Sequence, residues 1–302
     1  MKVLVSGSTG LIGAALVRRL TELGHQVIRL VRSGGGPHSD EVAWDPAADW
    51  IDRSALEAAA VEAVVHLAGE NIGAGRWTAQ KKARIRNSRI HGTALLAQAL
   101  SALSSPPRVL ASASAIGFYG NRGNEELDES SPAGSGFLPE LCRDWEAAAQ
   151  SAAETGIRVV NLRFGLVLAA YGGALARMLP MFRLGLGGPL GSGRQYVSWI
   201  TLDDAVAAIA ALVDNFPLQG PVNLVAPQPV TSREFARALG RALRRPAILP
   251  APSFLLRLLL GEMAEATLLS STRAVPRRLL ESGFSFRDPA LQSGLCRLLG
   301  RA

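Results

Sequence analysis

Three glycines near the N-terminus, Gly7, Gly10 and Gly13, lie between an apolar run at residues 3–5 and an amphipathic run at residues 14–23. Their Gly-x-x-Gly-x-x-Gly spacing predicts a buried strand that passes into a helix through a turn too tight for side chains. The free N–H groups and positive dipole end of such a helix bind anions, most often the pyrophosphate of a dinucleotide. The predicted contacts are Gly7, Ser8, Thr9, Gly10, Leu11, Ile12 and Gly13.

The end of the next predicted strand, residues 27–31, discriminates between the two nicotinamide dinucleotides. NAD binders of this kind place Asp or Glu there to accept hydrogen bonds from the adenosine ribose. This chain has Arg32 followed by Ser33. An arginine cannot accept those bonds, but its planar guanidinium matches a 2′-phosphate. The pattern favours NADP(H), with Ser33 as a further donor; the alternative is a solvated arginine at a strand exit.

A third segment at the end of a predicted strand is Leu67-Ala68-Gly69-Glu70. The small residues Ala68 and Gly69 allow the backbone to approach the ribose and pyrophosphate of the cofactor. Glu70 can face the nicotinamide or a substrate, or it can be solvated, as loop carboxylates usually are.

The elements that position these segments alternate between apolar runs and helical patterns. Strands are predicted at 27–31, 63–67, 108–112 and 158–162, and helices at 14–23, 54–60, 79–103 and 138–154. Apolar runs of this length between helices indicate parallel strands that are buried on both faces. The predicted fold class is α/β, a Rossmann-like doubly wound parallel sheet.

The alternation loosens after Phe164, where glycine-rich loops and three further helices, at 230–244, 254–260 and 275–282, are predicted. We therefore expect an NADP-binding Rossmann domain over residues 1–165, to which part of 195–230 returns. A smaller C-terminal substrate lobe would comprise most of residues 166–302.

The composition of the chain indicates the cellular compartment of the protein. The two cysteines, Cys142 and Cys296, form no disulfide framework and favour a reducing compartment. No signal-peptide pattern follows Met1, and the apolar run at 254–260 is interrupted by Arg257. That run is far shorter than the roughly 20 residues of a membrane span. We expect a soluble, cytoplasmic protein that has no membrane role.

The formal net charge of +7 comes almost entirely from arginines spread along the chain. The densest cluster, residues 81–89, is predicted to be the solvated face of a helix, and no nucleic-acid-binding motif accompanies it. The charge therefore indicates a preference for anionic small molecules, not nucleic acid. No spacing of metal ligands occurs, so no metal is expected, and the residues carry no signal for an oligomeric state.

Taken together, these segments resemble the extended branch of the short-chain dehydrogenase/reductase superfamily, which includes sugar-nucleotide epimerases and reductases. Besides the glycine turn, residues 66–69 resemble the segment that ends the family's fourth strand, and residues 112–114 resemble its catalytic serine strand. The resemblance implies that Ser114 donates a hydrogen bond to a substrate carbonyl. It also implies that the backbone at Phe164 and Gly165 approaches the carboxamide of the cofactor.

The catalytic pair of that family, Tyr-x-x-x-Lys, is absent, because no lysine follows the tyrosines at 119, 171 and 196 by four residues. By context, Leu138 and Cys142 occupy the positions of the pair, and Arg89 stands where the family has asparagine. This combination, with the segments 276–280 and 283–289, resembles an atypical epimerase-like subgroup that has Cys for Lys and a distinctive C-terminal segment. Members of this subgroup are described as NADP-dependent oxidoreductases or nucleotide-sugar epimerases of unknown substrate.

Several residues are candidates for the missing chemistry. Tyr119, on the glycine-flanked loop 117–120, is either a substitute proton donor or a packed aromatic. Cys142 either contacts the nicotinamide ribose or is a small buried hydrophobe, with Arg89 as its cationic neighbour. Arg163 either lies at the carboxamide or pairs with a structural carboxylate.

The sequence thus predicts an NADP(H)-binding oxidoreductase or epimerase-like enzyme that acts on a carbonyl or sugar-nucleotide-like substrate. Ser114 would polarise the carbonyl, and Tyr119 or a water would handle the proton. The alternative, raised by the loss of both Tyr and Lys, is a non-catalytic NADP(H)-binding redox sensor or scaffold.

Overall fold

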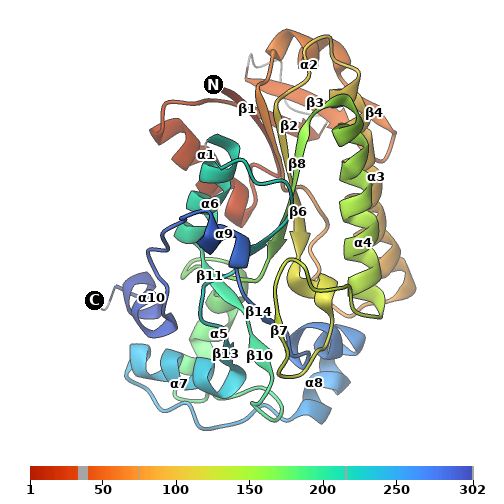
Figure 1. The fold of residues 1–302 in the computed structure, drawn as a ribbon. Coiled ribbons are helices and arrows are strands. Elements are labelled where there is room, and N and C mark those ends of the chain that lie inside the picture. The colour runs from red at the N-terminus through yellow and green to blue at the C-terminus, as the bar shows by residue number, and fades with distance from the viewer. Residues whose placement is uncertain (33–39, 74, 215, 301–302) are drawn as a thin grey trace.

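The computed structural model describes residues 1–32, 40–73, 75–214 and 216–300. Its centre is an eight-stranded sheet with helices on both faces (Figure 1). The strand order is β12-β8-β6-β5-β1-β2-β3-β4, and every neighbouring pair is parallel except β3 and β4. The doubly wound α/β fold predicted from the sequence is confirmed. The strands are β1 (Lys2–Ser6), β2 (Gln26–Arg32), β3 (Glu41–Asp45), β4 (Trp50–Ile51), β5 (Ala63–His66), β6 (Val109–Ala115), β8 (Arg158–Phe164) and β12 (Gly220–Leu224).

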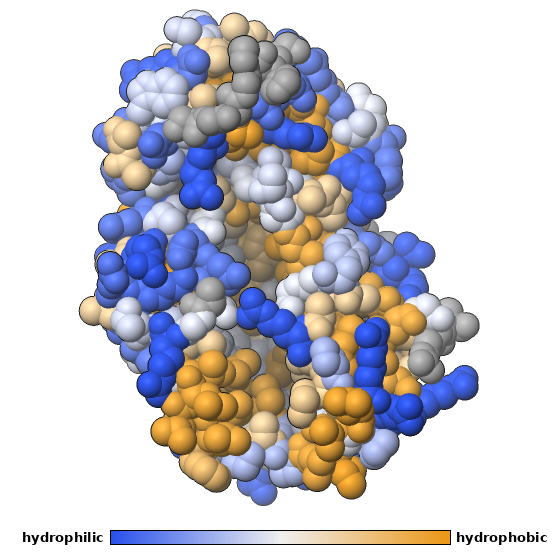
Figure 2. Space-filling view, turned by 180° about the vertical axis from the view of Figure 1, so that it is seen from behind, coloured by the Kyte–Doolittle hydropathy of each residue, from blue (hydrophilic) through white to orange (hydrophobic). Residues whose placement is uncertain are grey.

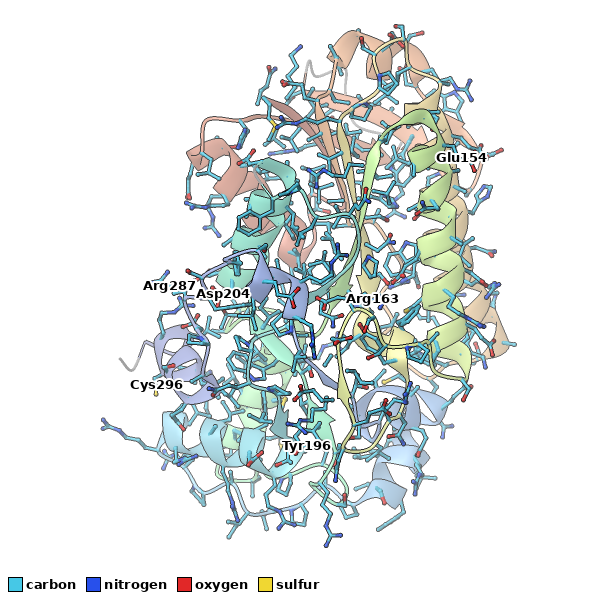
Figure 3. The ribbon with its side chains drawn as sticks, viewed as in Figure 1. Glu154, Arg163, Tyr196, Asp204, Arg287 and Cys296 are labelled. Carbon is cyan, nitrogen blue, oxygen red and sulfur yellow. The ribbon has the colours of Figure 1, made fainter. Side chains whose placement is uncertain are left out.

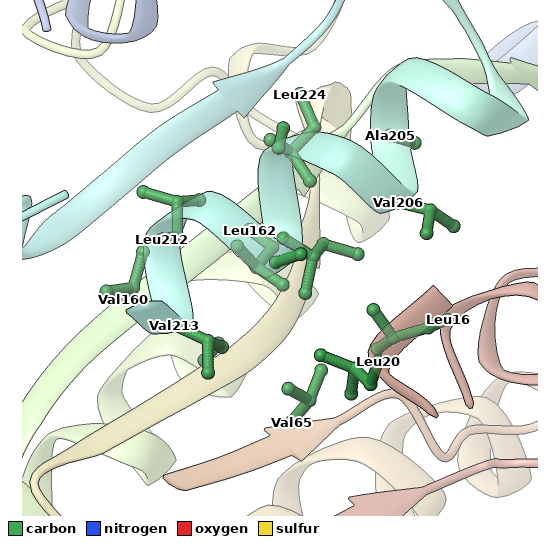
Figure 4. Close-up of a cluster of buried hydrophobic side chains, with 14 of the residues drawn as sticks. Leu16, Leu20, Val65, Val160, Leu162, Ala205, Val206, Leu212, Val213 and Leu224 are labelled. Atoms are coloured by element: carbon green, nitrogen blue, oxygen red, sulfur yellow. The ribbon is translucent and has the colours of Figure 1, made fainter. Parts of the chain in front are cut away.

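Two apolar layers join the sheet to its helices. On one face, α1 (Leu11–Glu22) and α6 (Leu202–Asp214) lie side by side (Figure 1), and their buried leucines and valines contact β1, β5 and β8 (Figure 4). On the other face lie α2 (Arg53–Ala59), α3 (Ala79–Ser101) and α4 (Phe137–Gln150). The central strands β1, β5, β6 and β8 are therefore covered on both sides and are buried almost continuously, whereas β2 and β3 nearer the edge alternate between buried and more exposed residues.

The strand order reverses between β1 and β5, because the chain proceeds from β1 to β2 and β3 on one side and to β5, β6, β8 and β12 on the other. Ligands of open α/β sheets bind outside the carboxyl ends of the strands at such a point. Ser6 of β1 and His66 of β5 are register partners there, so the glycine turn and the segment 67–70 lie next to each other.

The remaining elements gather below the sheet, in the lower half of Figure 1. They form three small sheets, β7 (Glu126–Leu127) with β14 (Arg273–Ala274), β9 (Leu166–Leu168) with β11 (Trp199–Thr201), and β10 (Tyr196–Val197) with β13 (Val230–Thr231). Their helices are α5 (Gly173–Arg183), α7 (Ser232–Leu243), α8 (Ser253–Leu260), α9 (Arg277–Glu281) and α10 (Leu291–Leu298). Three short helices complete the chain, η1 (Ile116–Tyr119), η2 (Ser151–Thr155) and η3 (Ala264–Leu268).

The observed helices differ from the predicted ones by up to four residues at an end, and α1 begins at Leu11 instead of residue 14. The helix expected from residue 230 begins at Ser232, because Thr231 closes β13 and forms a capping box with Glu234. The helix expected over 138–154 ends at Gln150 and continues as the 3₁₀ helix η2. Within the described ranges, no helix combines the length and apolar character that a membrane span requires.

Candidate functional site

The glycine turn between β1 and α1 is shaped by close backbone contacts. Gly7 has a φ of +66°, and a Cβ at this residue would lie 2.9 Å from the carbonyl carbon of Leu67. A Cβ at Gly13 would lie 2.1 Å from the carbonyl oxygen of Gly7. These two glycines therefore let β1, β5 and α1 approach one another. Gly10 is exposed, and its missing Cβ leaves room for a ligand above the turn.

The first turn of α1 has unpaired donors at this point. Gly10 is the N-cap of α1, and among the described residues no side chain accepts a hydrogen bond from the first N–H groups of this helix. Ser8 is nearly buried and Thr9 is exposed beside the turn, while Leu11 and Ile12 pack against the core below. Free N–H groups and the dipole of a helix that lacks a side-chain cap favour an anion here.

Arg32, at the carboxyl end of β2, is exposed and forms no ion pair with the part of the chain that the structure describes. β2 is hydrogen-bonded to β1, so Arg32 lies at the same edge of the sheet as the glycine turn. Ser33, predicted as a second phosphate contact, lies outside the described residues.

A buried histidine orders the start of the segment 67–70. The N–H groups of Leu67 and Ala68 donate to Ser6 Oγ at 3.0 and 3.2 Å, and Ser6 Oγ lies 2.7 Å from His66 Nδ1. Because Ser6 Oγ accepts two bonds, its own proton points to His66. Burial lowers the pKa of His66 to about 4, so the imidazole is neutral and acts as a structural acceptor.

The side chain of Glu70, predicted either to face the nicotinamide or a substrate or to be solvated, pairs with a lysine of α3. Its carboxylate accepts a hydrogen bond from Lys81 Nζ at 2.6 Å, and this bond lowers the pKa of Glu70. Its carbonyl oxygen accepts from Arg89 Nη1 at 3.0 Å. The guanidinium of Arg89 also stacks on Trp145, at 4.9 Å from the ring centroid, and packs under Gly69. Arg89 thus supports the segment 67–70 from below.

A buried polar network connects the end of β6 with α4 and β8. Ser114 Oγ donates to Glu146 Oε1 at 2.6 Å. Arg163 holds both oxygens of the same carboxylate at 2.8 Å and is only 3% exposed. The hydrogen bonds of Glu146 raise the pKa of Arg163, although burial opposes this effect. Figure 3 shows Arg163 near the middle of the molecule, where both lobes meet. Of the two alternatives for Arg163, the structure has the pair with a structural carboxylate.

The position of Tyr119 favours one of its two predicted roles. The residue is completely buried, with its hydroxyl donating to Asn223 Oδ1 at 2.8 Å and accepting from Arg163 Nη1 at 3.0 Å. Burial raises the pKa of Tyr119 to about 12. Both partners hold the phenol in the core between the two lobes. This placement favours the packed aromatic over the proton donor.

Cys142 on α4 is 2% exposed, and burial raises the pKa of its thiol to about 12. The neighbouring carboxylate of Glu146 raises this pKa further, and Arg89 and Arg163 lower it by less. The thiol is therefore neutral at physiological pH, and the hypothesis of a reactive cysteine is not supported. Its sulfur packs 3.9 Å from the position of a Cβ at Gly117, which is the contact of a small buried hydrophobe.

We expect Cys142 to resist alkylation while the protein is folded, because only the thiolate reacts and the buried thiol does not ionise near neutral pH. At pH 8, iodoacetamide should modify the half-buried Cys296 and leave Cys142 unmodified, as counted by mass spectrometry of peptides. Both residues should react in guanidinium chloride. Rapid labelling of Cys142 in the folded protein would contradict this assignment.

A cavity of about 520 Å³ opens where the sheet meets the lower elements. Phe164 and Gly165 line it, as do Ala115, which follows Ser114, and Leu138, which stands at the tyrosine position of the related family. The structure thus brings three predicted segments, 114–117, 138–142 and 164–165, to one place. Pockets of a few hundred Å³ with this enclosure accept small organic molecules.

Sequence reasoning missed two partners that organise this region. Glu146 joins Ser114 and Arg163, and its position four residues after Cys142 on the same helix face was the available signal. Asn223 holds Tyr119 from β12, more than 100 residues away, and no local pattern indicates that contact. Among the described residues, no group of His, Cys, Asp and Glu side chains could hold a metal ion.

Comparison with known proteins agrees with this geometry. A family model for the NAD dependent epimerase/dehydratase family matches residues 3–224, and a domain of unknown function, DUF1731, matches residues 251–298. The epimerase family protein Mb2239 of Mycobacterium bovis is 44% identical over 293 residues, covering 97% of this chain and 96% of the relative. The second match lies at the distinctive C-terminal segment that the sequence analysis singled out.

Two solved structures extend the comparison. Human epimerase family protein SDR39U1, solved with NADPH, superposes with a TM-score of 0.90 at 35% identity and covers 100% of both chains. A nucleoside-diphosphate sugar epimerase from Corynebacterium glutamicum gives a TM-score of 0.80 at 33% identity, covering 99% of this chain and 58% of that one. The family match runs from β1 to β12 and so contains the glycine turn, the Ser114 strand and the whole parallel sheet; this chain belongs to the NAD dependent epimerase/dehydratase family.

Proposed function

We propose that this protein binds NADP(H) across the carboxyl ends of β1, β2 and β5 and reduces or oxidises a small carbonyl or hydroxyl compound. The observation that carries the proposal is the N-terminus of α1, which has no side-chain cap and lies at a turn that only glycine can form. Arg32 at the adjacent strand end supports the phosphorylated dinucleotide. The 35% identical human relative, solved with NADPH, supports the same choice.

The proposed cofactor contacts follow from the placement of each segment. Backbone and hydroxyl groups of the turn would hold the pyrophosphate, Arg32 the 2′-phosphate, and the backbone of 67–70 the riboses. Ser33 would add a further hydrogen bond to the phosphate, and Phe164 and Gly165 would contact the carboxamide. For Glu70 we propose only a backbone contact with the cofactor, because its carboxylate already accepts a hydrogen bond from Lys81. When bound, the cofactor supplies or accepts a hydride at its nicotinamide.

This chain lacks the family's catalytic pair, Tyr-x-x-x-Lys. We therefore propose a separate residue for the role of the lysine and for the role of the tyrosine. The cation under the nicotinamide ribose would be Arg89, which is held in place by Trp145 and the carbonyl of Glu70. Cys142 would contribute only packing beside it. Ser114 would turn its hydroxyl from Glu146 to the carbonyl oxygen of the substrate and polarise it. Arg163 holds the carboxylate of Glu146 in place, so the serine hydroxyl retains an acceptor when no substrate is bound.

We also propose which lobe binds the cofactor and which lobe binds the substrate. Residues 1–165, with β12 and α6 returned from the later chain, would form the cofactor domain, and most of 166–302 the substrate lobe. A sensor or scaffold without turnover is not favoured, since a cavity of about 520 Å³ adjoins the cofactor edge. We place the protein in the cytoplasm, with a small-molecule substrate and no nucleic-acid or membrane partner.

Arg32→Glu is expected to invert the cofactor preference, because a carboxylate repels the 2′-phosphate and accepts hydrogen bonds from a free ribose. The ratio of the NADH to the NADPH dissociation constant should fall about 100-fold, as the loss of one charge-assisted contact and the gain of repulsion together imply. Fluorescence titration with both reduced cofactors measures this ratio. An unchanged ratio would remove Arg32 from the site.

Ser114→Ala is expected to lower kcat/KM about 100-fold while NADPH binding stays within twofold, since the hydroxyl would act on the substrate carbonyl only. NADPH oxidation with the best compound of a carbonyl panel gives the rate. Ser112→Ala, on the same strand and equally buried, is the matched control and should retain activity. Equal losses in both variants would argue against a role of Ser114 in catalysis.

A further inference from the structure

The wall of the cavity between the sheet and the lower elements is almost free of charge. Its lining residues, all of them within the described ranges, include no lysine, arginine or histidine. The two charged lining residues are acidic, and each already has a partner: Glu262 binds Lys82 at 2.8 Å, and Glu265 binds Arg257 at 2.7 Å. Most of the remaining wall is apolar, with Ile116, Phe137, Leu138, Phe164, Met178 and Phe235 as its largest side chains.

Most polar side chains of the lining are already used by the protein. Ser198 Oγ donates to the carbonyl oxygen of Thr272 at 2.9 Å, and Thr272 Oγ1 donates to that of Gly120 at 2.9 Å. Ser232 Oγ accepts from the N–H of Leu190 at 3.1 Å. The hydrogen bonds within this wall thus leave a ligand few polar partners, among them the hydroxyl of Tyr196, which Figure 3 shows in the lower half of the molecule.

One feature of the wall attracts negative charge, the N-terminus of α4, whose residues Gly136 and Phe137 line the cavity. No side chain caps it, but Pro139 lacks an N–H, and Glu140 places a carboxylate in its first turn. The donors that remain suit one carbonyl or hydroxyl oxygen of a ligand. A diphosphate would need several charged partners to offset its desolvation, and the wall offers none.

The surroundings of the cavity are apolar as well. Leu258 and Leu259 of α8, both more than half exposed, lie a few residues before the lining residues 262 and 265, and Leu249 contacts the lining residue Gly188. Figure 2 shows two apolar areas at the lower end of the molecule with a hollow between them. Exposed apolar area of this extent marks a binding surface.

We propose that this cavity takes an uncharged, mainly apolar carbonyl compound of one or two rings, or the matching alcohol, and does not take a nucleoside diphosphate sugar. The inference rests on the proposed function, in that the cavity is the substrate site of that reaction. The substrate is recognised by apolar contact along Phe137, Met178 and Phe235, and its single oxygen lies at the end of the cavity formed by residues 115–117 and 137–138.

The test uses two neutral probes and one nucleotide sugar. N-phenyl-1-naphthylamine, an uncharged dye that fluoresces in apolar surroundings, is titrated into the full chain with and without oxidised NADP⁺. The dye should bind saturably, the bicyclic ketone 2-tetralone should displace it, and UDP-glucose at 1 mM, roughly a typical upper KM, should not. Displacement by UDP-glucose with no effect of 2-tetralone would overturn the proposal.

A variant pair assigns the dye to this cavity. Ala266→Trp places a large side chain on the lining and should weaken dye binding at least about tenfold. Ala59→Trp, at a half-buried alanine of α2 remote from the cavity, should leave it within twofold. Equal affinities in both variants would place the dye elsewhere and overturn the proposal.

NADPH binding is measured on the same proteins. This measurement distinguishes a failure of the proposed function from a failure of the proposed substrate class. Dye and ketone binding without NADPH binding would refute the proposed function and leave the cavity's specificity intact. NADPH binding together with UDP-glucose binding would uphold the cofactor assignment and refute the apolar substrate class. Ala266→Trp should bind NADPH as the unmodified chain does, which shows that the variant is folded.

Discussion

Gly13→Ala is expected to weaken NADPH binding by at least about 100-fold. The new Cβ would lie 2.1 Å from the carbonyl oxygen and 2.8 Å from the carbonyl carbon of Gly7, both of them backbone atoms. α1 cannot retreat, because Leu16 and Leu20 of this helix are fully buried against the sheet. The turn must therefore deform, and two hydrogen bonds to a phosphate, each about 1.5–3 kcal/mol, are lost with it.

Fluorescence titration with NADPH measures the loss, and two glycine variants serve as comparisons. Gly24→Ala adds a Cβ that meets nothing within 4 Å, at a φ of +81°, so it introduces backbone strain without a contact and should bind NADPH normally. Gly10→Ala, whose Cβ would lie 3.3 Å from Gly7 O on the exposed side, should weaken NADPH binding with little loss of stability. Normal NADPH binding by Gly13→Ala would refute the placement of the pyrophosphate on α1.

Arg163→Met is expected to destabilise the protein by about 3–5 kcal/mol, because it leaves the carboxylate of Glu146 buried without its cation. The side chains of Arg163 and Glu146 are 4% and 12% exposed, so solvent screens the pair little. Arg163 also donates to the hydroxyl of Tyr119 and packs on Phe118, 3.5 Å from the ring centroid. Removal of the Arg163 side chain therefore disturbs the packing of α4, β8 and η1 against one another.

Urea unfolding at neutral pH measures this loss. Arg19→Met, which removes an exposed pair with Glu22 at 3.7 Å, is the matched control and should change stability by less than about 1 kcal/mol. Combining Arg163→Met with Glu146→Gln should recover part of the loss, since the second change removes the unpaired charge. A loss for Arg163→Met as small as that for Arg19→Met would show that the network does not stabilise the fold.

The same network explains how a member of this family can lack Tyr-x-x-x-Lys and keep an ordered site. Ser114 remains at the end of β6 with the carboxylate of Glu146 as its acceptor, and Arg89 supplies a cation under the segment 67–70. By sequence context Leu138, which lines the cavity, and the buried thiol of Cys142 stand at the positions of the tyrosine and the lysine. In the proposed reaction, Ser114 or solvent would supply the proton at the substrate oxygen, and the walls beyond it would select apolar compounds.

Much of the site could be read directly from the chain because its features are local. The glycine turn is encoded in seven consecutive residues, since strand, turn and helix follow one another without help from distant segments. The same is true of Arg32 at a strand end and of the small residues at 67–69. The alternation of apolar runs and helices likewise determined the doubly wound sheet, because parallel strands buried on both faces require it.

The alternatives that the sequence left open depend on contacts between distant segments. Tyr119 sits on a loop flanked by glycines, and only the packing of β12 against it shows that its hydroxyl is bound to Asn223. Glu146 and Arg163 lie 17 residues apart on a helix and a strand, and their pairing depends on which faces α4 and β8 turn to each other. No local sequence pattern indicates which faces of α4 and β8 contact each other.

The sequence by itself determined that this chain folds as a Rossmann-like sheet, with a turn suited to a dinucleotide and without the usual catalytic pair. Only the tertiary structure decided what lies at the carboxyl ends of β6 and β8: a buried Ser114–Glu146–Arg163 network, a neutral Cys142 and a cavity with no cation among its described lining residues. The physical reason is that charge pairing, burial and pKa shifts depend on neighbours from distant parts of the chain. The network forms only when α4 packs against β6 and β8, and the cavity forms only where the lower elements meet the sheet.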